Sequence, residues 1–423
     1  MSSALLSYDQ ALALVSACAT QLARARPSAE RVELGRAAGR VLALPLFADR
    51  DQPPFVRSTR DGFACRASEA SVHIPLTIVG TTHAGEAPSG PLPPGAAWEI
   101  MTGAPVPAGA DAVVMLEHVE VVEGQLRLLP PRKVTPGENI VAQGAQAHQG
   151  DLLLPAGTPL KPAQIALAAA CGCAALDVSL RPRVAILATG DELVPVESSP
   201  APGQIRNSNG PMLAAMVEAG GGKPWLLPTA ADNAQALDDA LAQAAEADLL
   251  LISGGVSAGK FDLVEPALAR AGARFHFTGV RIQPGEPLVF GELPVRNARA
   301  NQNKNGTMCF FGLPGNPVSS AVTFLLFAAP VLAALAGSLE SYPRFALARL
   351  ASATDKNSKP GLTRFLPAHC DFGAIAGQLP EVALVPWRGS GDLAALARAN
   401  CFLVVPEETH QLEPGAIVRI LLV

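Results

Sequence analysis

The alternation of short apolar runs, glycine-containing loops and helix-forming segments between residues 183 and 330 constrains the fold most strongly. Val184–Leu187, Leu249–Ile252 and Met308–Phe311 are continuous apolar runs, which are typical of strands buried on both faces. A glycine-containing loop follows each run, and a helix-forming segment comes next. We therefore expect a mostly parallel sheet with helices on both faces, that is, a three-layer α/β domain.

The segments around this domain have a different pattern. A Ser7-x-x-Gln10 capping box predicts an amphipathic helix at the start of the chain. Short β-type runs alternate with Pro and Gly clusters between residues 51 and 144, and short strands with turns return after residue 338. We predict an α/β plus β chain of four parts: a helical and linking part (1–50 with 145–180), a β-rich module (51–144), the α/β domain (181–338) and a C-terminal small β-barrel, or alternatively a sandwich (339–423).

Charge and composition exclude several classes of protein. The 32 Lys and Arg against 37 Asp and Glu give a net charge of −5, so no nucleic-acid partner is expected. The apolar stretch 318–337 contains Pro330 and is Ala-rich, which favours a buried helix over a membrane span. The N-terminal residues lack an export signal pattern, which indicates a cytoplasmic protein with reduced thiols. The seven cysteines, Cys171-x-Cys173 included, have no metal-ligand spacing with the dispersed histidines, and we interpret them as small buried thiols.

Four loops are expected at the edge of the sheet where the strands end: Thr189–Glu192, Ser253–Ser257, Pro284–Pro287 and Gly312–Pro317. Ligands bind at this edge in doubly wound sheets. Glycines let backbone N–H groups approach a phosphate or another oxyanion, and a helix N-terminus favours negative charge. None of the loops matches a complete phosphate-binding motif. Each alone is compatible with an ordinary tight turn, whereas four on one edge favour a ligand site.

Four carboxylates recur beside these glycines: Asp191, Glu192, Asp232 and Asp262. An acid next to a phosphate-binding backbone generally acts through a divalent cation, because carboxylate and phosphate repel each other. Structural roles compete with this interpretation. Asp232 can cap a helix over residues 234–247, and Asp262 can cap or charge the start of the next helix.

Three further positions have two interpretations each. Asn209 can cap a helix that has Pro211 in its first turn. Lys260 can neutralise a phosphate or be a solvated lysine. In the β-rich module, Arg57–Ala64 contains two Arg, two hydroxyls and Asp61, and Thr102 follows another β-type run. These two module segments do not identify a reaction by themselves.

Taken in order, the motifs resemble one family, the molybdopterin molybdotransferases (MoeA family), which includes the gephyrin E domain. The matching segments run through almost the whole chain: Ser58–Ala64, Met101–Pro107, Thr-Gly-Asp-Glu-Leu at 189–193, Ile-Arg-Asn-Ser-Asn-Gly at 205–210, Gly-Gly-Val-Ser at 254–257, Leu-Pro-Gly-Asn-Pro-Val-Ser at 313–319 and Gly-Ser-Gly-Asp-Leu at 389–393. The resemblance implies an elongated subunit in a homodimer. It also implies that adenylylated molybdopterin receives molybdate, that Mg²⁺ assists the release of AMP, and that the product passes to molybdoenzymes.

The resemblance also implies site residues. Five positions match the family's functional acids and hydroxyl: Asp61, Thr102, Glu192, Asp232 and Asp262. Glu192 and Asp262 would serve the metal and the pyrophosphate, and Asp61 and Thr102 would come from the opposing subunit. The remaining candidates would bind substrate: Ser58, Gly190, Asp191, Asn209, Gly254, Gly255, Ser257, Lys260, Pro284, Pro314, Gly315, Asn316, Pro317, Arg364 and Ser390.

Two departures from the family pattern stand out. The usual Lys-Pro-Gly-Lys-Pro turn is Gln283-Pro284-Gly285-Glu286-Pro287 here, and a Glu near molybdate repels it. Arg60 replaces an apolar residue and can pair with Asp61 or contact a phosphate. The alternatives are therefore a non-catalytic pterin-nucleotide-binding or scaffold protein and an unrelated Mg²⁺-dependent nucleotide hydrolase. The sequence does not decide between molybdate and tungstate, and it gives the basic 296–306 loop no role.

Overall fold

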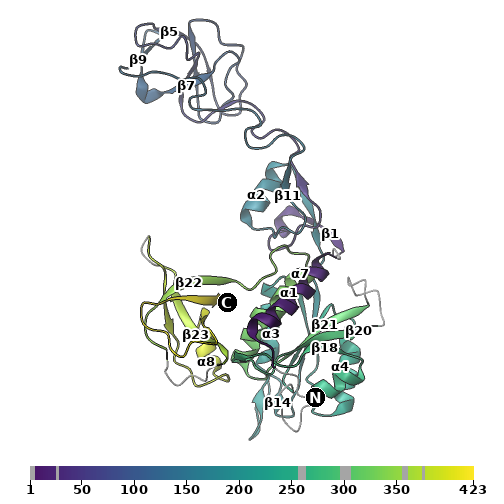
Figure 1. The fold of residues 1–423 in the computed structure, drawn as a ribbon. Coiled ribbons are helices and arrows are strands. Elements are labelled where there is room, and N and C mark those ends of the chain that lie inside the picture. Colours follow the sequence, from purple (N-terminus) through teal and green to yellow (C-terminus); the bar gives the residue numbers. More distant parts are fainter. Residues whose placement is uncertain (1–4, 25–27, 256–262, 296–305, 355–360, 374–376) are drawn as a thin grey trace. The chain divides into compact units, whose positions relative to one another are not determined.

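The computed structural model describes residues 5–24, 28–255, 263–295, 306–354, 361–373 and 377–423 (Figure 1). It divides into two compact units. We call Met1–Leu44, Ala156–Pro162 and Ala175–Val423 the main unit. We call Pro45–Pro155 and Ala163–Ala174 the β-rich unit.

A six-stranded sheet forms the centre of the main unit. Its strands lie in the order β16 (Lys223–Leu226), β13 (Arg183–Ala188), β17 (Leu249–Ser253), β21 (Thr307–Leu313), β20 (Val289–Pro294) and β18 (Arg274–Phe277). The first four strands are parallel, whereas β20 and β18 are antiparallel to their neighbours. The expected mostly parallel sheet is therefore mixed at one edge, where the described residues between β18 and β21 form no helix that could serve as a parallel crossover.

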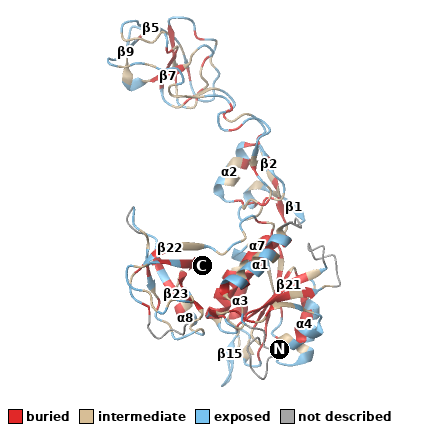
Figure 2. Ribbon diagram, in the orientation of Figure 1, coloured by how far each residue is buried: buried red, intermediate tan, exposed pale blue. Residues whose placement is uncertain are grey.

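Helices cover both faces of this sheet, as the continuous apolar runs predict. One core contains α1 (Tyr8–Arg24), α3 (Asn209–Ala219), α6 (Pro317–Thr323) and α7 (Ala329–Leu335); the other contains α4 (Ala234–Ala244) and α5 (Val264–Arg270). Successive residues of β13 alternate between the two cores: Val184 and Ile186 face the first, and Ala185 and Leu187 face the second. Figure 2 shows the buried strands between these layers.

The apolar stretch after residue 316 is a buried helix, as expected. Pro317–Leu335 is apolar and long enough to cross a bilayer, but 83% of its most apolar window is buried inside the protein. A π-helical turn, Phe324–Ala328, joins α6 to α7 just before Pro330. Proline lacks an N–H and its ring collides with the preceding turn, so the wider turn accommodates it within a continuous helix.

The C-terminal region of the main unit is a closed five-stranded barrel, which confirms the barrel and not the sandwich. Its strands are β23 (Thr363–Asp371), β24 (Glu381–Leu384), β22 (Phe345–Leu350), β26 (Ile417–Leu422) and β25 (Cys401–Val405), and β25 pairs back with β23. The short β19 (Ile282–Gln283) adds to β23, and α8 (Leu393–Arg398) packs beside it. Smaller elements complete the unit: β1 (Ala29–Glu33), a 3₁₀ turn (Leu34–Arg36), β12 (Ala175–Ser179), β14 (Leu193–Val194) and β15 (Ile205–Arg206).

The β-rich unit contains the expected β-type runs. Its sheet has the order β7 (Ala112–Met115), β4 (Gly62–Cys65), β6 (Ala96–Ile100), β5 (Leu76–Thr82), β9 (Gln125–Leu128) and β8 (Val119–Val122). The other elements are β2 (Leu46–Phe47), β11 (Leu152–Leu154), β3 (Arg57–Ser58), β10 (Ile140–Val141), a 3₁₀ turn (Leu116–His118) and α2 (Pro162–Ala170). Glu123 and Gly124, both at positive φ, form the β8–β9 hairpin turn.

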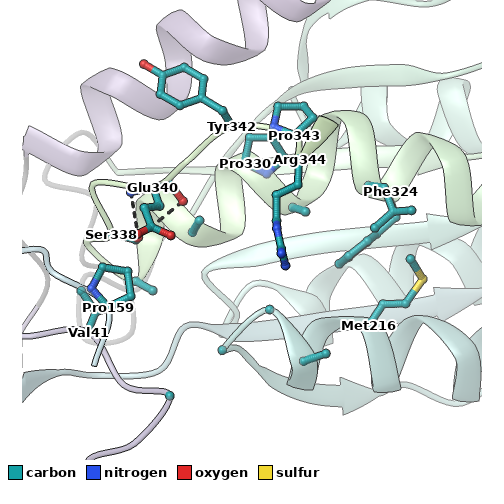
Figure 3. A pocket seen from close by; sticks show the side chains of 18 of the residues that line it. Val41, Pro159, Met216, Phe324, Pro330, Ser338, Glu340, Tyr342, Pro343 and Arg344 are labelled. Atoms are coloured by element: carbon teal, nitrogen blue, oxygen red, sulfur yellow. Dashed lines mark hydrogen bonds between the residues drawn. The ribbon is translucent and has the colours of Figure 1, made fainter. Parts of the chain in front are cut away.

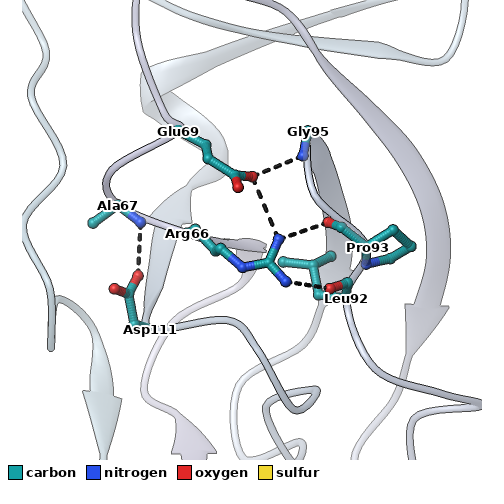
Figure 4. Close-up of polar contacts among 7 residues, drawn as sticks. All are labelled: Arg66, Ala67, Glu69, Leu92, Pro93, Gly95 and Asp111. Carbon is teal, nitrogen blue, oxygen red and sulfur yellow. Dashed lines mark hydrogen bonds and ion pairs between the residues drawn. The ribbon is translucent and has the colours of Figure 1, made fainter.

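Arg66 fixes the proline-rich loop of this unit (Figure 4). Its guanidinium donates to the carbonyl oxygens of Leu92 and Pro93 at 2.6 and 2.8 Å and pairs with Glu69. Glu69 in turn accepts the N–H of Gly95 at 2.7 Å. The loop before β6 is therefore held by hydrogen bonds to one planar cation, whose fork geometry suits two carbonyls at once.

The capping box at the start of α1 provides a test of the fold. The Gln10 N–H donates to Ser7 Oγ, and Gln10 Oε1 accepts the Ser7 N–H. Ser7→Ala is expected to lower the free energy of unfolding by about 1 kcal/mol in urea titrations, because an N–H of the first turn loses its acceptor. The control Thr20→Ala, at an exposed interior position of the same helix, should cause no loss.

Candidate functional site

The loops that follow β13, β17 and β21 start side by side. Ala188, Ser253 and Leu313 are register partners across the three parallel strands. The loops are also joined by backbone hydrogen bonds, from Thr189 N–H to the Ser253 carbonyl and from Gly254 N–H to the Leu313 carbonyl. Three of the four predicted loops thus meet at one edge of the sheet.

A cavity of about 690 Å³ opens at this edge. Its walls come from the loops after the three strands, from the start of α3 and from the α8 region of the barrel. The lining includes Thr189, Gly190, Glu192, Asn209, Asp232, Ser253, Gly254, Gly255, Pro287, Pro314, Gly315, Asn316, Pro317 and Gly391. The volume suits a ligand of cofactor size.

Asn209 connects two of the loops and does not cap its helix. Its Nδ2 donates to Ser253 Oγ at 2.8 Å and to the Gly315 carbonyl at 2.6 Å, and its side chain is buried. The predicted capping role is wrong, because the N-cap position is Ser208 and Asn209 is the first helical residue. Its buried Oδ1 has no hydrogen-bond partner within the described part of the chain, so an acceptor is left at the cavity wall.

Gly254 and Gly255 adopt a conformation that other residues rarely enter, with φ of 96° and 64°. A Cβ atom at Gly254 would lie 2.7 Å from the Thr189 carbonyl, and one at Gly255 would lie 2.7 Å from Val264. Only glycine satisfies both demands. The loop therefore presents backbone rather than side chain to the cavity, which is the arrangement expected for an oxyanion ligand.

Two of the predicted acids line the cavity, Glu192 and Asp232. Asp232 is not the cap of α4: the cap is Asn233, whose Oδ1 accepts the Ala236 N–H at 2.9 Å. The Asp232 N–H instead donates to Asp191 Oδ1, which places the third acid beside the other two. Partial burial raises the pKa of the Asp232 carboxyl, and the negative charges of Asp191 and Glu192 raise it as well. Such a cluster suits a divalent cation.

The barrel contributes the far wall. Asn316 Nδ2 donates to Ser390 Oγ at 2.9 Å, and Val318 N–H donates to the Ser390 carbonyl.

Two other predicted residues lie elsewhere. Pro284 is buried outside the lining, and Pro287 of the same turn reaches the cavity. Arg364 is 5% exposed and donates to the Thr409 carbonyl inside the barrel, so it does not line the cavity in this conformation.

Ser257, Lys260 and Asp262 lie outside the described residues, so the structure does not test their predicted roles. The loop 296–306 is outside as well, apart from Gly306.

The β-rich unit brings together its own predicted residues. Gly62 and Ile100 are register partners, so Asp61 and Thr102 lie next to each other at the ends of β4 and β6. The Thr102 N–H donates to Asp61 Oδ1 at 2.6 Å and lowers the pKa of this exposed carboxyl. Ser58 is buried, and its hydroxyl donates to the Arg60 carbonyl. The Arg60 guanidinium donates to the Thr59 carbonyl at 3.3 Å, and in the described contacts it has no pairing with Asp61.

A second cavity of the main unit, about 610 Å³, is more apolar (Figure 3). Phe324, Met216 and Pro330 line it together with Arg344 and Glu340. It lacks the glycine-rich strand ends that mark the first cavity.

Sequence reasoning missed the short parallel pair β14–β15, whose residues Leu193, Ile205 and Arg206 also line the first cavity. Its strands are two residues long, too short for a periodic pattern. The match to the family motif at 205–210 is the signal that points to them.

The raised pKa of Asp232 predicts a pH dependence of stability. The Asp232 carboxyl binds a proton more tightly in the folded state than in the unfolded state. Protonated Asp232 therefore adds to the free energy of unfolding below pH 3.8, and this addition is lost as the pH rises through the raised pKa. In metal-free buffer, the free energy of unfolding of Asp232→Asn relative to wild type should increase between pH 4 and pH 7. Urea titrations at both pH values measure it. The control Asn233→Ala should cost about 1 kcal/mol at both, since an amide does not titrate.

Three family models match the chain in order: the MoeA N-terminal region (domain I and II) over residues 6–172, a probable molybdopterin binding domain over 185–334, and the MoeA C-terminal region (domain IV) over 349–423. The molybdopterin molybdenumtransferase of Nostoc is 35% identical over 404 residues, covering 93% of this chain and 88% of its own. The Bacillus subtilis protein of the same name is 35% identical over 407 residues, covering 93% and 90%. The crystal structure of the molybdopterin biosynthesis MoeA protein from Pyrococcus horikoshii OT3 aligns with a TM-score of 0.77 at 30% identity, covering 99% of this chain and 100% of that one. The chain therefore belongs to the MoeA family of molybdopterin molybdenumtransferases.

Proposed function

We propose that this enzyme of molybdenum cofactor biosynthesis transfers molybdate onto adenylylated molybdopterin and releases AMP. The observation that carries the proposal is the glycine-lined cavity at the aligned ends of β13, β17 and β21, with Glu192 and Asp232 in its wall. Backbone N–H groups at these loops suit the pyrophosphate of the nucleotide. The cavity's size and mixed lining suit the pterin.

Mg²⁺ would be held by Glu192 and Asp232, with Asp191 beside them, and by Asp262, which the family resemblance implies as a ligand. The grouping of the three acids is the observation that fits a cation there: Glu192 and Asp232 line the cavity, and the Asp232 N–H donates to Asp191 Oδ1. When bound, the ion would neutralise charge on the pyrophosphate. The protein's own groups then have distinct tasks: Gly254 and Gly255 present backbone to the phosphates, and Asn209 and Asn316 fix the loops that bracket the ligand.

We further propose that Asp61 and Thr102 act on the ligand of a partner subunit in a homodimer. Support comes from the resemblance and from their adjacent positions at two strand ends of the β-rich unit. Ser58 would hold this segment through its hydrogen bond to Arg60. A cytoplasmic location, handover of the product to molybdoenzymes and the four-part division of the chain remain predictions.

Release of AMP tests this proposal against its alternatives. With adenylylated molybdopterin, Mg²⁺ and molybdate, AMP should appear together with molybdenum-loaded pterin, and omission of molybdate should suppress both. Equal AMP release without molybdate would indicate a nucleotide hydrolase, and binding without turnover would indicate a scaffold protein. The comparisons give no support for the scaffold alternative.

Glu192→Gln tests the acid cluster in the same assay. We expect a loss of AMP release of about 100-fold or more, because the amide cannot balance the charge of a divalent cation. Glu218→Gln, an exposed acid on α3 outside the cavity lining, is the control and should retain activity. Full activity of Glu192→Gln would contradict our assignment of the cation site.

The turn 283–287 predicts weak binding of the oxyanion. Glu286 is exposed, and Pro287 directly after it lines the cavity. Glu286→Lys replaces repulsion by attraction, so molybdate should bind about tenfold more tightly. Molybdate titrations of the AMP-release rate measure this, with Glu286→Gln expected between wild type and Lys. Equal affinity in all three proteins would show that the turn does not lie near the anion.

A further inference from the structure

A group of potential metal ligands lies on the face of the central sheet that α1 covers, apart from the first cavity. It consists of Cys18 on α1, Glu292 on β20 and Cys309 on β21. One ligand atom from each residue lies within 4.8 Å of the other two. Glu292 and Cys309 are register partners in the antiparallel pair, so their side chains share one face of the sheet.

The spacing of these atoms fits a tetrahedral ion. The two Sγ atoms are 3.5 Å apart, and both cysteines are free thiols. In a tetrahedral site with Zn–S bonds near 2.3 Å, two sulfurs lie about 3.8 Å apart. The thiols thus need only a small displacement to hold such an ion.

A further donor lies beside Glu292, outside the group of three whose ligand atoms are within 4.8 Å of one another. His276 Nε2 is buried, has no hydrogen-bond partner among the residues that the structure describes, and lies 3.8 Å from Glu292 Oε2. A β-bulge between Phe275 and Phe277 breaks the alternation of β18, and the His276 ring lies against Phe290 on the α1 side. An unpartnered buried nitrogen next to a half-buried carboxylate is costly unless something satisfies both.

We propose that Cys18, Cys309 and Glu292 bind a Zn²⁺ ion, with His276 as the fourth ligand. Two thiolates are the ligands that select thiophilic ions such as Zn²⁺ over Mg²⁺. The formal charge of the loaded site is −1, as in a Cys₃His zinc site. The ion would tie α1 to three strands of the sheet, β18, β20 and β21.

This position gives the ion a structural effect. The chain just before α1 pairs with the segment ahead of the 283–287 turn: the Arg281 N–H donates to the Leu6 carbonyl at 2.7 Å. An ion that anchors α1 therefore also steadies the base of that turn. The proposal does not depend on the proposed reaction.

Zinc titration of the tag-free, reduced full-length protein tests the proposal. Excess Mg²⁺ occupies the acid cluster of the first cavity, and a chromophoric chelator reports the zinc affinity. We expect one tight ion per chain. Cys18→Ser should weaken it at least about 100-fold, and Glu292→Gln should weaken it about tenfold. Cys173→Ser, which removes another half-buried thiol, is the matched control and should bind like wild type.

Thermal unfolding shows whether each variant is folded, so that a loss of zinc binding is not confused with misfolding. Zinc should raise the unfolding midpoint of wild type and Cys173→Ser, but not that of Cys18→Ser. Binding of Co²⁺ in place of zinc should give a thiolate charge-transfer band that Cys18→Ser lacks. The proposal is overturned if reduced wild type binds no zinc under these conditions, or if Cys18→Ser binds it as tightly as wild type.

Discussion

The alignment of three parallel strand ends is the constraint on which the site depends. Ala188, Ser253 and Leu313 lie in register, so the loops after β13, β17 and β21 begin at one level. The register is set by apolar residues that alternate between two cores, because a shift of one residue would turn every side chain of a strand to the wrong face. The geometry of the cavity is thus a consequence of burial on both faces of the sheet.

Buried polar contacts convert this alignment into a defined cavity. Asn209 donates to Ser253 and to Gly315, which fixes α3 against two of the loops. Asn316 extends the same kind of contact to Ser390 of the barrel. Leaving the acceptors of such contacts unsatisfied costs more than the contacts contribute, so these amides favour one arrangement of the loops. The acids beside them repel one another, and this repulsion adds to the effect of partial burial in raising the pKa of Asp232. Carboxylates with a raised pKa, clustered in this way, are typical of functional sites, including sites that bind a cation.

Much of the fold could be predicted from the sequence because its signals are local. Apolar runs located β13, β17 and β21, and the Ser7–Gln10 capping box located the start of α1. The antiparallel edge of the sheet was missed, since periodicity does not report strand direction. The helix-capping interpretations of Asn209 and Asp232 were wrong, although both have the right residue type. Tertiary contacts recruit Asn209 to the loops, and the neighbouring Asn233 caps α4. The grouping of Cys18, Glu292 and Cys309 had no sequence signal, because 291 positions separate the two cysteines.

We assign the pyrophosphate of the nucleotide to the glycine-lined strand ends. A crystal structure of the protein with adenylylated molybdopterin and Mg²⁺ tests this most directly. We predict phosphate oxygens within hydrogen-bonding distance of the Gly254 and Gly255 backbone, with the ion on Glu192 and Asp232. A nucleotide bound elsewhere, for example in the apolar cavity beside Arg344 and Phe324, would contradict the account.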